Sequence, residues 1–265
     1  MSSLLQAENL SKRYGEKLLF ENIDIHISEG QKIALVAKNG TGKTSLMNIL
    51  AGTDTGDTGS LSMRRELRIA YLPQDLVLDP EKSVLEAVFF QDDEIITTIR
   101  QYNDLMSSQE HTGLQNILDK MDRLNAWDYE ARVKQILGKL KIDEFGKKIK
   151  HLSGGQKKRV ALAGTLISEP ELLILDEPTN HLDLDMIEWL EEYLDKSSMT
   201  IFMVTHDRYF LDRVCNLILE MDMGKLFTYQ GNYSYFVEKR AERIDNLQAN
   251  IDRAQNLMRT EQEWI

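Results

Sequence analysis

The apolar residues of the chain gather in short, nearly continuous runs at residues 32–36, 171–176 and 200–205. Runs of this kind predict strands that are buried on both faces of a parallel sheet. The first run leads into a glycine-rich loop and then a helical pattern from Ser45, which gives a strand–loop–helix unit. The other two runs end in polar clusters, at the edge where open α/β sheets bind ligands. The pattern predicts an α/β fold with a binding site at that edge.

Between residues 84 and 140 the apolar positions change to helical spacing within long polar stretches. The positions that carry this pattern include Ile95, Ile99, Tyr102, Leu105, Met106, Leu114, Ile117, Leu118, Met121 and Leu124. We interpret this region as a mostly helical insertion in the sheet domain.

The last segment of the chain alternates apolar spacings of three and four, which is typical of a helix with a coiled-coil-like seam. The seam consists of Val237, Ile244, Leu247, Ile251, Ala254, Met258 and Ile265. Arg240 and Glu261 interrupt it. Because the pattern carries no stop signal, we expect a longer helix that is cut in mid-course. A frayed terminal helix packed on its own domain is the alternative.

Charge changes this picture only locally. The net charge is -11 at pH 7, which disfavours a general attraction to nucleic acid or anionic lipid. The segment from Lys139 to Arg159 nevertheless carries 8 basic residues against Asp143 and Glu144, a local basic patch on an acidic chain. A solvated helix–loop face explains the first five lysines equally well, and the last three basic residues can belong to the following helix.

The chain contains one cysteine, Cys215, which excludes an internal disulfide framework and a cysteine-based zinc site. We interpret Cys215 as a small buried hydrophobe. The N-terminus lacks a basic leader followed by an apolar core, and no apolar run reaches the ~20 residues that span a bilayer. We therefore expect a cytoplasmic protein without a membrane segment.

The glycine-rich loop after the first strand matches most of a phosphate-binding loop. In such loops backbone N–H groups and a helix N-terminus face the anion, Lys reaches the β- and γ-phosphates, and Thr holds Mg²⁺. Gly40, Gly42, Lys43 and Thr44 occupy these positions. Ala37 replaces the first glycine of the motif, which costs ~1 kcal/mol or more if its φ is positive.

Two further motifs complete the candidate site. Asp176 and Glu177 end a buried strand, where the first carboxylate can orient Mg²⁺ and the second can polarise the attacking water. Residues 153–156, with the sequence Ser-Gly-Gly-Gln, place a hydroxyl and two glycines at a helix start, which predicts a second anion site. A plain Ser-capped helix explains Ser153 but not the adjacent glycines.

These motifs together resemble the ATP-binding cassette (ABC) ATPases over residues 3 to about 232. The resemblance implies a P-loop, RecA-like ABC ATPase core with an antiparallel β subdomain and an inserted helical subdomain, followed by a C-terminal linker helix. We place the ATPase domain at residues 1–236, its helical subdomain at about 84–160, and the truncated linker helix at 237–265.

The resemblance also implies the site residues and the cofactors, ATP and Mg²⁺. The catalytic positions are Glu177, His206 and Gln74. The metal positions are Thr44, Gln74 and Asp176. The nucleotide-binding positions are Tyr14, Asn39, Gly40, Thr41, Gly42, Lys43, Thr44, Ser45, Ser153, Gly154, Gly155, Gln156 and Asp183. In this family two cassettes close head to tail, so Ser153 and Gly155 of one cover the ATP held by the other.

The run from Asp176 to Asp183, Asp-Glu-Pro-Thr-Asn-His-Leu-Asp, and the terminal charged helix resemble the ABC-F proteins, and the residues before Ile265 look most like their Uup-type branch. This resemblance implies the N-terminal cassette of a protein that acts on the ribosome, with DNA as another partner that the Uup branch suggests. The second cassette lies on the same chain or on a second copy. The alternatives are the ATPase subunit of a membrane transporter and a nucleotide-sensing module with negligible hydrolysis.

Overall fold

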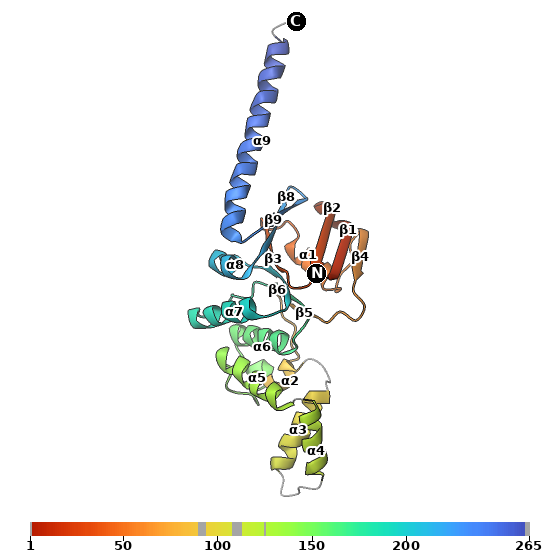
Figure 1. The fold of residues 1–265 in the computed structure, drawn as a ribbon, viewed down its shortest axis with the longest axis vertical. Coiled ribbons are helices and arrows are strands. Elements are labelled where there is room, and N and C mark those ends of the chain that lie inside the picture. The colour runs from red at the N-terminus through yellow and green to blue at the C-terminus, as the bar shows by residue number, and fades with distance from the viewer. Residues whose placement is uncertain (1, 90–93, 108–112, 125, 263–265) are drawn as a thin grey trace.

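The computed structural model describes residues 2–89, 94–107, 113–124 and 126–262 (Figure 1). Two sheets form its centre. A small antiparallel sheet has the strand order β2-β1-β4, and a larger sheet has the order β5-β6-β7-β3-β8-β9. The small sheet consists of β1 (Ser3–Tyr14), β2 (Lys17–Ser28) and β4 (Thr58–Met63). The larger sheet consists of β3 (Lys32–Ala37), β5 (Ile69–Leu72), β6 (Leu172–Asp176), β7 (Thr200–Val204), β8 (Leu217–Asp222) and β9 (Lys225–Gln230).

The three predicted strands are confirmed as β3, β6 and β7, and they pair in parallel in the register Ile33↔Phe202 and Leu173↔Ile201. Only β9 runs antiparallel to its neighbour in this sheet. Every residue of β6 and β7 is buried, which explains why neither run alternates with polar residues. Their carboxyl ends therefore meet at one edge, where the polar residues that follow them gather.

Both faces of the larger sheet are covered. Ile33 and Leu35 of β3 pack with α1 and the small sheet, whereas Ala34 belongs to the core under the helices of the opposite face. The helices are α1 (Lys43–Leu50), α2 (Val84–Val88), α3 (Glu94–Ser107), α4 (Leu114–Arg123), α5 (Ala126–Lys139), α6 (Gly154–Ile167), α7 (Leu184–Lys196), α8 (Arg208–Val214) and α9 (Tyr233–Gln262), with a 3₁₀ turn at Ile149–His151.

The helical pattern between residues 84 and 140 corresponds to α2 through α5. Ile99, Met121 and Ala126 form a separate small core, with partly buried Ile95 and Tyr102 packed against it. Figure 1 shows α3 and α4 at the opposite end of the molecule from α9. Helix α6 runs on beyond residue 160, and its second half is fully buried in the main core. The bounds of a helical subdomain at about 84–160 stay a prediction.

Helix α9 begins at Tyr233, before the expected linker start at residue 237. Its first turns are fixed to the sheet: Phe236 is buried against the Tyr229 ring, and both Arg240 and Arg243 bind the buried Glu220 carboxylate. Arg240, which interrupts the seam in the sequence, therefore has a partner on β8.

Farther along α9 the seam faces solvent. The exposed fraction is 46% for Ile244, 53% for Leu247 and 48% for Ile251. Ala254 and Met258 lie in the helix, but their side chains and the whole of Ile265 fall outside the described residues. The anchored turns and the exposed seam are thus two distinct parts of one helix.

Cys215 is buried, as predicted, and its burial raises the pKa of the thiol to about 12. Among the helices that the structure describes, none combines the length and the apolar character that crossing a membrane requires.

Candidate nucleotide-binding site

The glycine-rich loop connects β3 to α1. Gly40 and Gly42 have φ values of 76° and 100°, a left-handed region that glycine adopts readily. A Cβ at Gly42 would lie 2.9 Å from the Leu19 Cβ, so this position also needs glycine for space. Ala37 ends the strand and is not among the residues with a left-handed backbone. The conformational cost that alanine would carry at a positive φ therefore does not arise.

The N-terminus of α1 has no side-chain cap, because its N-cap residue is Gly42. The first backbone amides of a helix lack partners within the helix, and together with the helix dipole they favour an anion. The Lys43 ammonium donates to the Ala37 carbonyl at 3.0 Å and to Asn39 Oδ1 at 3.2 Å. The Lys43 ammonium and the uncapped backbone amides at the start of α1 thus belong to one loop, and this arrangement fits a phosphate group.

Asp176 and Thr44 meet beside this loop. Thr44 Oγ1 donates to Asp176 Oδ2 at 3.3 Å. Burial raises the pKa of Asp176, and the Thr44 hydrogen bond opposes that shift. Within the described residues no three His, Cys, Asp or Glu side chains form a metal cluster. Mg²⁺ commonly takes one or two protein oxygens together with phosphate oxygens and water, and Thr44 and Asp176 fit that donor set.

Glu177 and His206 form the far wall of the site. Glu177 is 7% exposed and has a φ of 52°, which is uncommon for a non-glycine residue and marks local strain. Its carboxylate lies 3.4 Å from His206 Nε2 and accepts a 3.3 Å hydrogen bond from the His206 amide. The strained backbone and the contact with His206 hold the buried Glu177 carboxylate at the polar edge of the sheet.

These residues share one cavity of about 580 Å³. The predicted site residues that line it are Tyr14, Asn39, Gly40, Gly42, Lys43, Thr44, Ser45, Gln74, Asp176, Glu177 and His206. Tyr14 is 80% exposed, so it is a free aromatic face and not a core residue. Thr41 is outside the lining, and its hydroxyl donates to the Lys38 carbonyl.

The cavity has three further lining residues that were not predicted: Lys17, Leu19 and Asn180. The Lys17 ammonium donates to the Gly40 carbonyl at 2.8 Å, so a second lysine supports the loop. Lys17 and Leu19 belong to β2, far from the loop in sequence and outside any motif, and only the fold brings them here. Asn180 lies inside the recognised run from Asp176 to Asp183, which was the available signal.

The other predicted nucleotide positions lie outside this cavity. Ser153, Gly154, Gly155 and Gln156 start helix α6, where Ser153 and Gln156 form a capping box through each other's backbone amides. Asp183 caps helix α7 by accepting from the Met186 amide at 3.1 Å. The chain therefore brings together the phosphate-loop half of the predicted site but does not bring residues 153–156 or Asp183 to it.

Four lysines of the predicted basic patch are ion-paired, so their charge is partly compensated. Lys148 and Lys150 both bind Glu81, at 3.0 Å and 2.9 Å, and Lys147 binds Glu144. Lys141 binds Asp183. Glu81 precedes Lys148 by 67 positions and Lys150 by 69, so counting charges within the segment could not include it. The solvated-face interpretation fits these lysines better.

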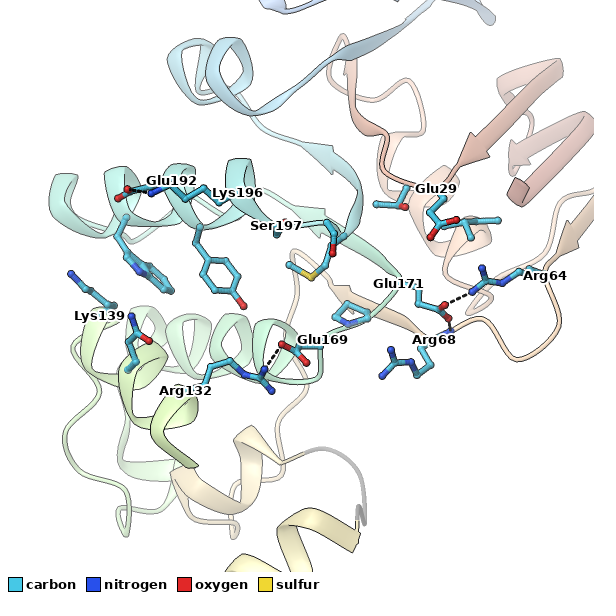
Figure 2. Close-up of a pocket in the computed structure, with 18 residues that line it drawn as sticks. Glu29, Arg64, Arg68, Arg132, Lys139, Glu169, Glu171, Glu192, Lys196 and Ser197 are labelled. Carbon is cyan, nitrogen blue, oxygen red and sulfur yellow. Dashed lines mark hydrogen bonds and ion pairs between the residues drawn. The ribbon is translucent and has the colours of Figure 1, made fainter. Parts of the chain in front are cut away.

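A larger cavity of about 830 Å³ lies between α5 and α7, beside the start of β6 (Figure 2). Six of its charged residues form three ion pairs: Arg64 with Glu171, Arg132 with Glu169, and Lys196 with Glu192. None of the predicted site residues lines it. Size alone therefore does not locate the chemistry, and the smaller cavity carries the phosphate-binding geometry.

A parallel sheet, a glycine-rich loop leading into a helix, and carboxylates at the end of another strand define a P-loop ATPase. The ABC transporter family model matches residues 20–180, and a second ABC transporter model matches residues 219–265. The chain belongs to the ABC transporter ATP-binding cassette family.

Three curated relatives cover nearly the whole chain. It is 43% identical over 99% of its length to the "Uncharacterized ABC transporter ATP-binding protein YfmR" of Bacillus subtilis. It is 34% identical over 97% of its length to the "Energy-dependent translational throttle protein EttA" of Mycobacterium tuberculosis, and 32% identical over 93% to that of Escherichia coli. The chain spans 43%, 48% and 46% of these relatives, respectively.

The fold has a solved counterpart. A structure described as an ATP-binding subunit of an ABC transporter matches with a TM-score of 0.65 and 22% identity, and the match covers 86% of this chain and 90% of the other. This likeness confirms the predicted α/β ABC ATPase fold. None of the relatives named above confirms the Uup-type branch or is named for DNA.

Proposed function

We propose that the chain binds ATP with Mg²⁺ and hydrolyses it as one cassette of an ABC-F-type protein that acts in translation. The observation that carries the ATPase part is the meeting of Lys43, Asp176, Glu177 and His206 in one cavity beside an uncapped helix N-terminus. A phosphate cradle, a magnesium-binding oxygen pair and a buried carboxylate are the parts that phosphoryl transfer to water requires.

Each residue has a chemical role in this proposal. Lys43 and the first amides of α1 hold the β- and γ-phosphates, and Tyr14 stacks on the adenine. Thr44, Asp176 and Gln74 would hold Mg²⁺, which neutralises phosphate charge when bound. Glu177 accepts a proton from the attacking water, and His206 contacts the γ-phosphate. Glu177 is fixed for this task by its contacts with His206.

A second cassette completes the site. Residues 153–156 and Asp183 lie outside the nucleotide cavity of their own chain, which supports a role on the cavity of a partner. Donors that reach the transition state only after closure separate ATP binding from turnover. We therefore expect one chain to bind ATP and a pair of cassettes to hydrolyse it efficiently.

The translational role rests on the relatives. Two of them are named translational throttle proteins, and the match covers nearly the whole chain, including the anchored start of α9. Such a role places the protein in the cytoplasm. The exposed seam of α9 supports a structure that continues from the cassette, as a linker between two cassettes does.

Sedimentation with ribosomes tests this role. The Glu177→Gln variant holds ATP without turnover, so it should sediment with ribosomes in ATP more than in ADP. The double variant Glu177→Gln/Lys43→Met is the matched control: at an ATP concentration near the Kd of Glu177→Gln it should bind little nucleotide and stay in the supernatant. Recovery of the protein with membranes, with no ATP-dependent ribosome binding, would overturn the translational role in favour of a transporter subunit.

A further inference from the structure

Lys141 lies just after α5, at the point where the helical region meets two segments of the ATPase face. It has a left-handed backbone with a φ of 52°, and its amide donates to the Gly138 carbonyl at 3.0 Å. This geometry ends α5 in a tight turn and sets the direction in which the Lys141 side chain leaves the turn.

The Lys141 ammonium binds the Asp183 carboxylate at 2.5 Å and lies 3.8 Å from that of Asp185. The other oxygen of Asp183 accepts from the Met186 amide at 3.1 Å, so one carboxylate both caps α7 and holds the lysine. The Lys141 hydrogen bond lowers the pKa of Asp183. The first turn of α7 is therefore tied to the end of α5.

The same turn is held from the side of helix α6. Arg159 donates to the Leu140 carbonyl at 2.9 Å and to the Lys141 carbonyl at 3.4 Å. Near the start of this helix, a Cβ added at Gly155 would lie 3.4 Å from the His181 Cβ, so the α6 start lies close to the loop that leads to Asp183. Figure 1 shows α6 between α5 and α7.

We propose that Lys141 is a positioning residue for ATP hydrolysis: it ties the Asp183 loop to the turn that Arg159 holds, so residues 153–156 and Asp183 approach the second cassette as one piece. This inference rests on the proposed function, because it needs a second cassette at that face. Lys141 touches no atom of the nucleotide cavity in its own chain, so its effect passes through Asp183.

The test compares Lys141→Met and Lys141→Arg with Lys147→Met in the full-length protein. Lys147 is the matched control, because it belongs to the same basic segment and forms a 2.7 Å ion pair, but with Glu144. We expect Lys141→Met to lower kcat about three- to tenfold with an ATP Kd within about twofold of wild type. Lys141→Arg should restore most of kcat, and Lys147→Met should match wild type.

Salt gives a second readout, because the pair is about half exposed on both sides. Raising the ionic strength should lower the kcat of the wild type toward that of Lys141→Met and should leave the Lys141→Met variant less affected. A wild-type kcat for Lys141→Met, or equal losses for the Met and Arg variants, would overturn the proposal.

Amide hydrogen exchange separates this inference from the proposed function. Exchange at Met186 and Ile187, whose amides bond to Asp183, should rise about three- to tenfold in Lys141→Met and stay unchanged in Lys147→Met, whether or not the protein hydrolyses ATP. Unchanged exchange in Lys141→Met contradicts the link itself. Increased exchange in a protein without ATPase activity would contradict the proposed function and the role in hydrolysis while leaving the link between Lys141 and Asp183 standing.

Discussion

Two helix N-termini of this chain differ in how their first backbone amides find hydrogen-bond partners. Helix α1 begins at a left-handed glycine with no side-chain cap, and polar residues of other strands and loops, among them Lys17, Asp176 and His206, line the same cavity. Helix α6 begins with a complete capping box between Ser153 and Gln156 and lies outside that cavity. The first terminus leaves its amides to a ligand, whereas the second is stable without one. Under the proposed function, nucleotide binding belongs to the single chain and the α6 terminus acts later, on a partner.

The largest expected effect tests the cavity itself. Replacing the buried carboxylate in Glu177→Gln should reduce ATP turnover about 10²–10⁴-fold, because the amide cannot accept the water proton. The substitution preserves size and leaves the strained backbone with a non-glycine residue, so ATP binding should persist. Steady-state phosphate release measures the first quantity, and binding of a fluorescent ATP analogue measures the second. Turnover at the wild-type rate would remove Glu177 from the proposed chemistry.

Lys43→Met should weaken ATP binding about ten- to a hundredfold, because a charged hydrogen bond to phosphate contributes about 1.5–3 kcal/mol. Titration of the purified chain with ATP in a calorimeter gives this value. Lys38→Met is the matched control: Lys38 belongs to the same loop but does not line the cavity, so its loss should change the affinity less than about threefold. Equal losses of ATP affinity in the two variants would show a general effect of charge and not a specific contact between Lys43 and the phosphates.

Tyr14→Ala should weaken ATP binding about tenfold, since stacking of a base on an aromatic ring contributes about 1–3 kcal/mol. Because Tyr14 is 80% exposed, the melting temperature should not change. Tyr14→Phe keeps the ring and should bind as wild type. If the wild type, Tyr14→Ala and Tyr14→Phe all bind ATP with one affinity, and likewise all bind GTP with one affinity, Tyr14 does not contact the base.

The smallest effect on ATP affinity is expected at the N-terminus of helix α6. Gly155→Ala adds a methyl group that meets His181 at an ordinary contact distance, so the chain should fold and its ATP Kd should stay within about twofold of wild type. Turnover of the assembled protein should nevertheless fall several-fold. Gly138→Ala, which adds a methyl group to open space on α5, is the control for both measurements. A large loss of ATP affinity in Gly155→Ala would contradict the division of labour between the two termini.

Much of the fold and of the cavity could be predicted from the sequence, because the signals are local. The continuous apolar runs correctly predicted β3, β6 and β7, and parallel pairing brings their polar ends to one edge. The resemblance to the ABC ATPases implied that Lys43, Thr44 and Asp176 belong to one site, and all three line the same cavity. The apolar spacing also predicted α3 and α4, whose Ile99 and Met121 form a small core.

Most of the errors and omissions involve contacts or backbone geometry that only the assembled fold sets. Counting charges within residues 139–159 missed Glu81, which binds Lys148 and Lys150 from another part of the chain. Arg240 looked like an interruption of the α9 seam because Glu220, its buried partner, belongs to β8. The conformational cost of alanine at position 37 could not be judged from the sequence, because the surrounding sheet sets the backbone φ there. Side-chain pairs of this kind follow from the assembled fold and not from local spacing.

The most direct test of the central claim measures ATP binding and ATP turnover on the same sample of this chain, diluted until light scattering shows a monomer. We expect saturable ATP binding at that dilution, with phosphate release close to background, and turnover that rises when a second cassette associates. A monomer that hydrolyses ATP at the same rate per chain as the assembled form would contradict this expectation.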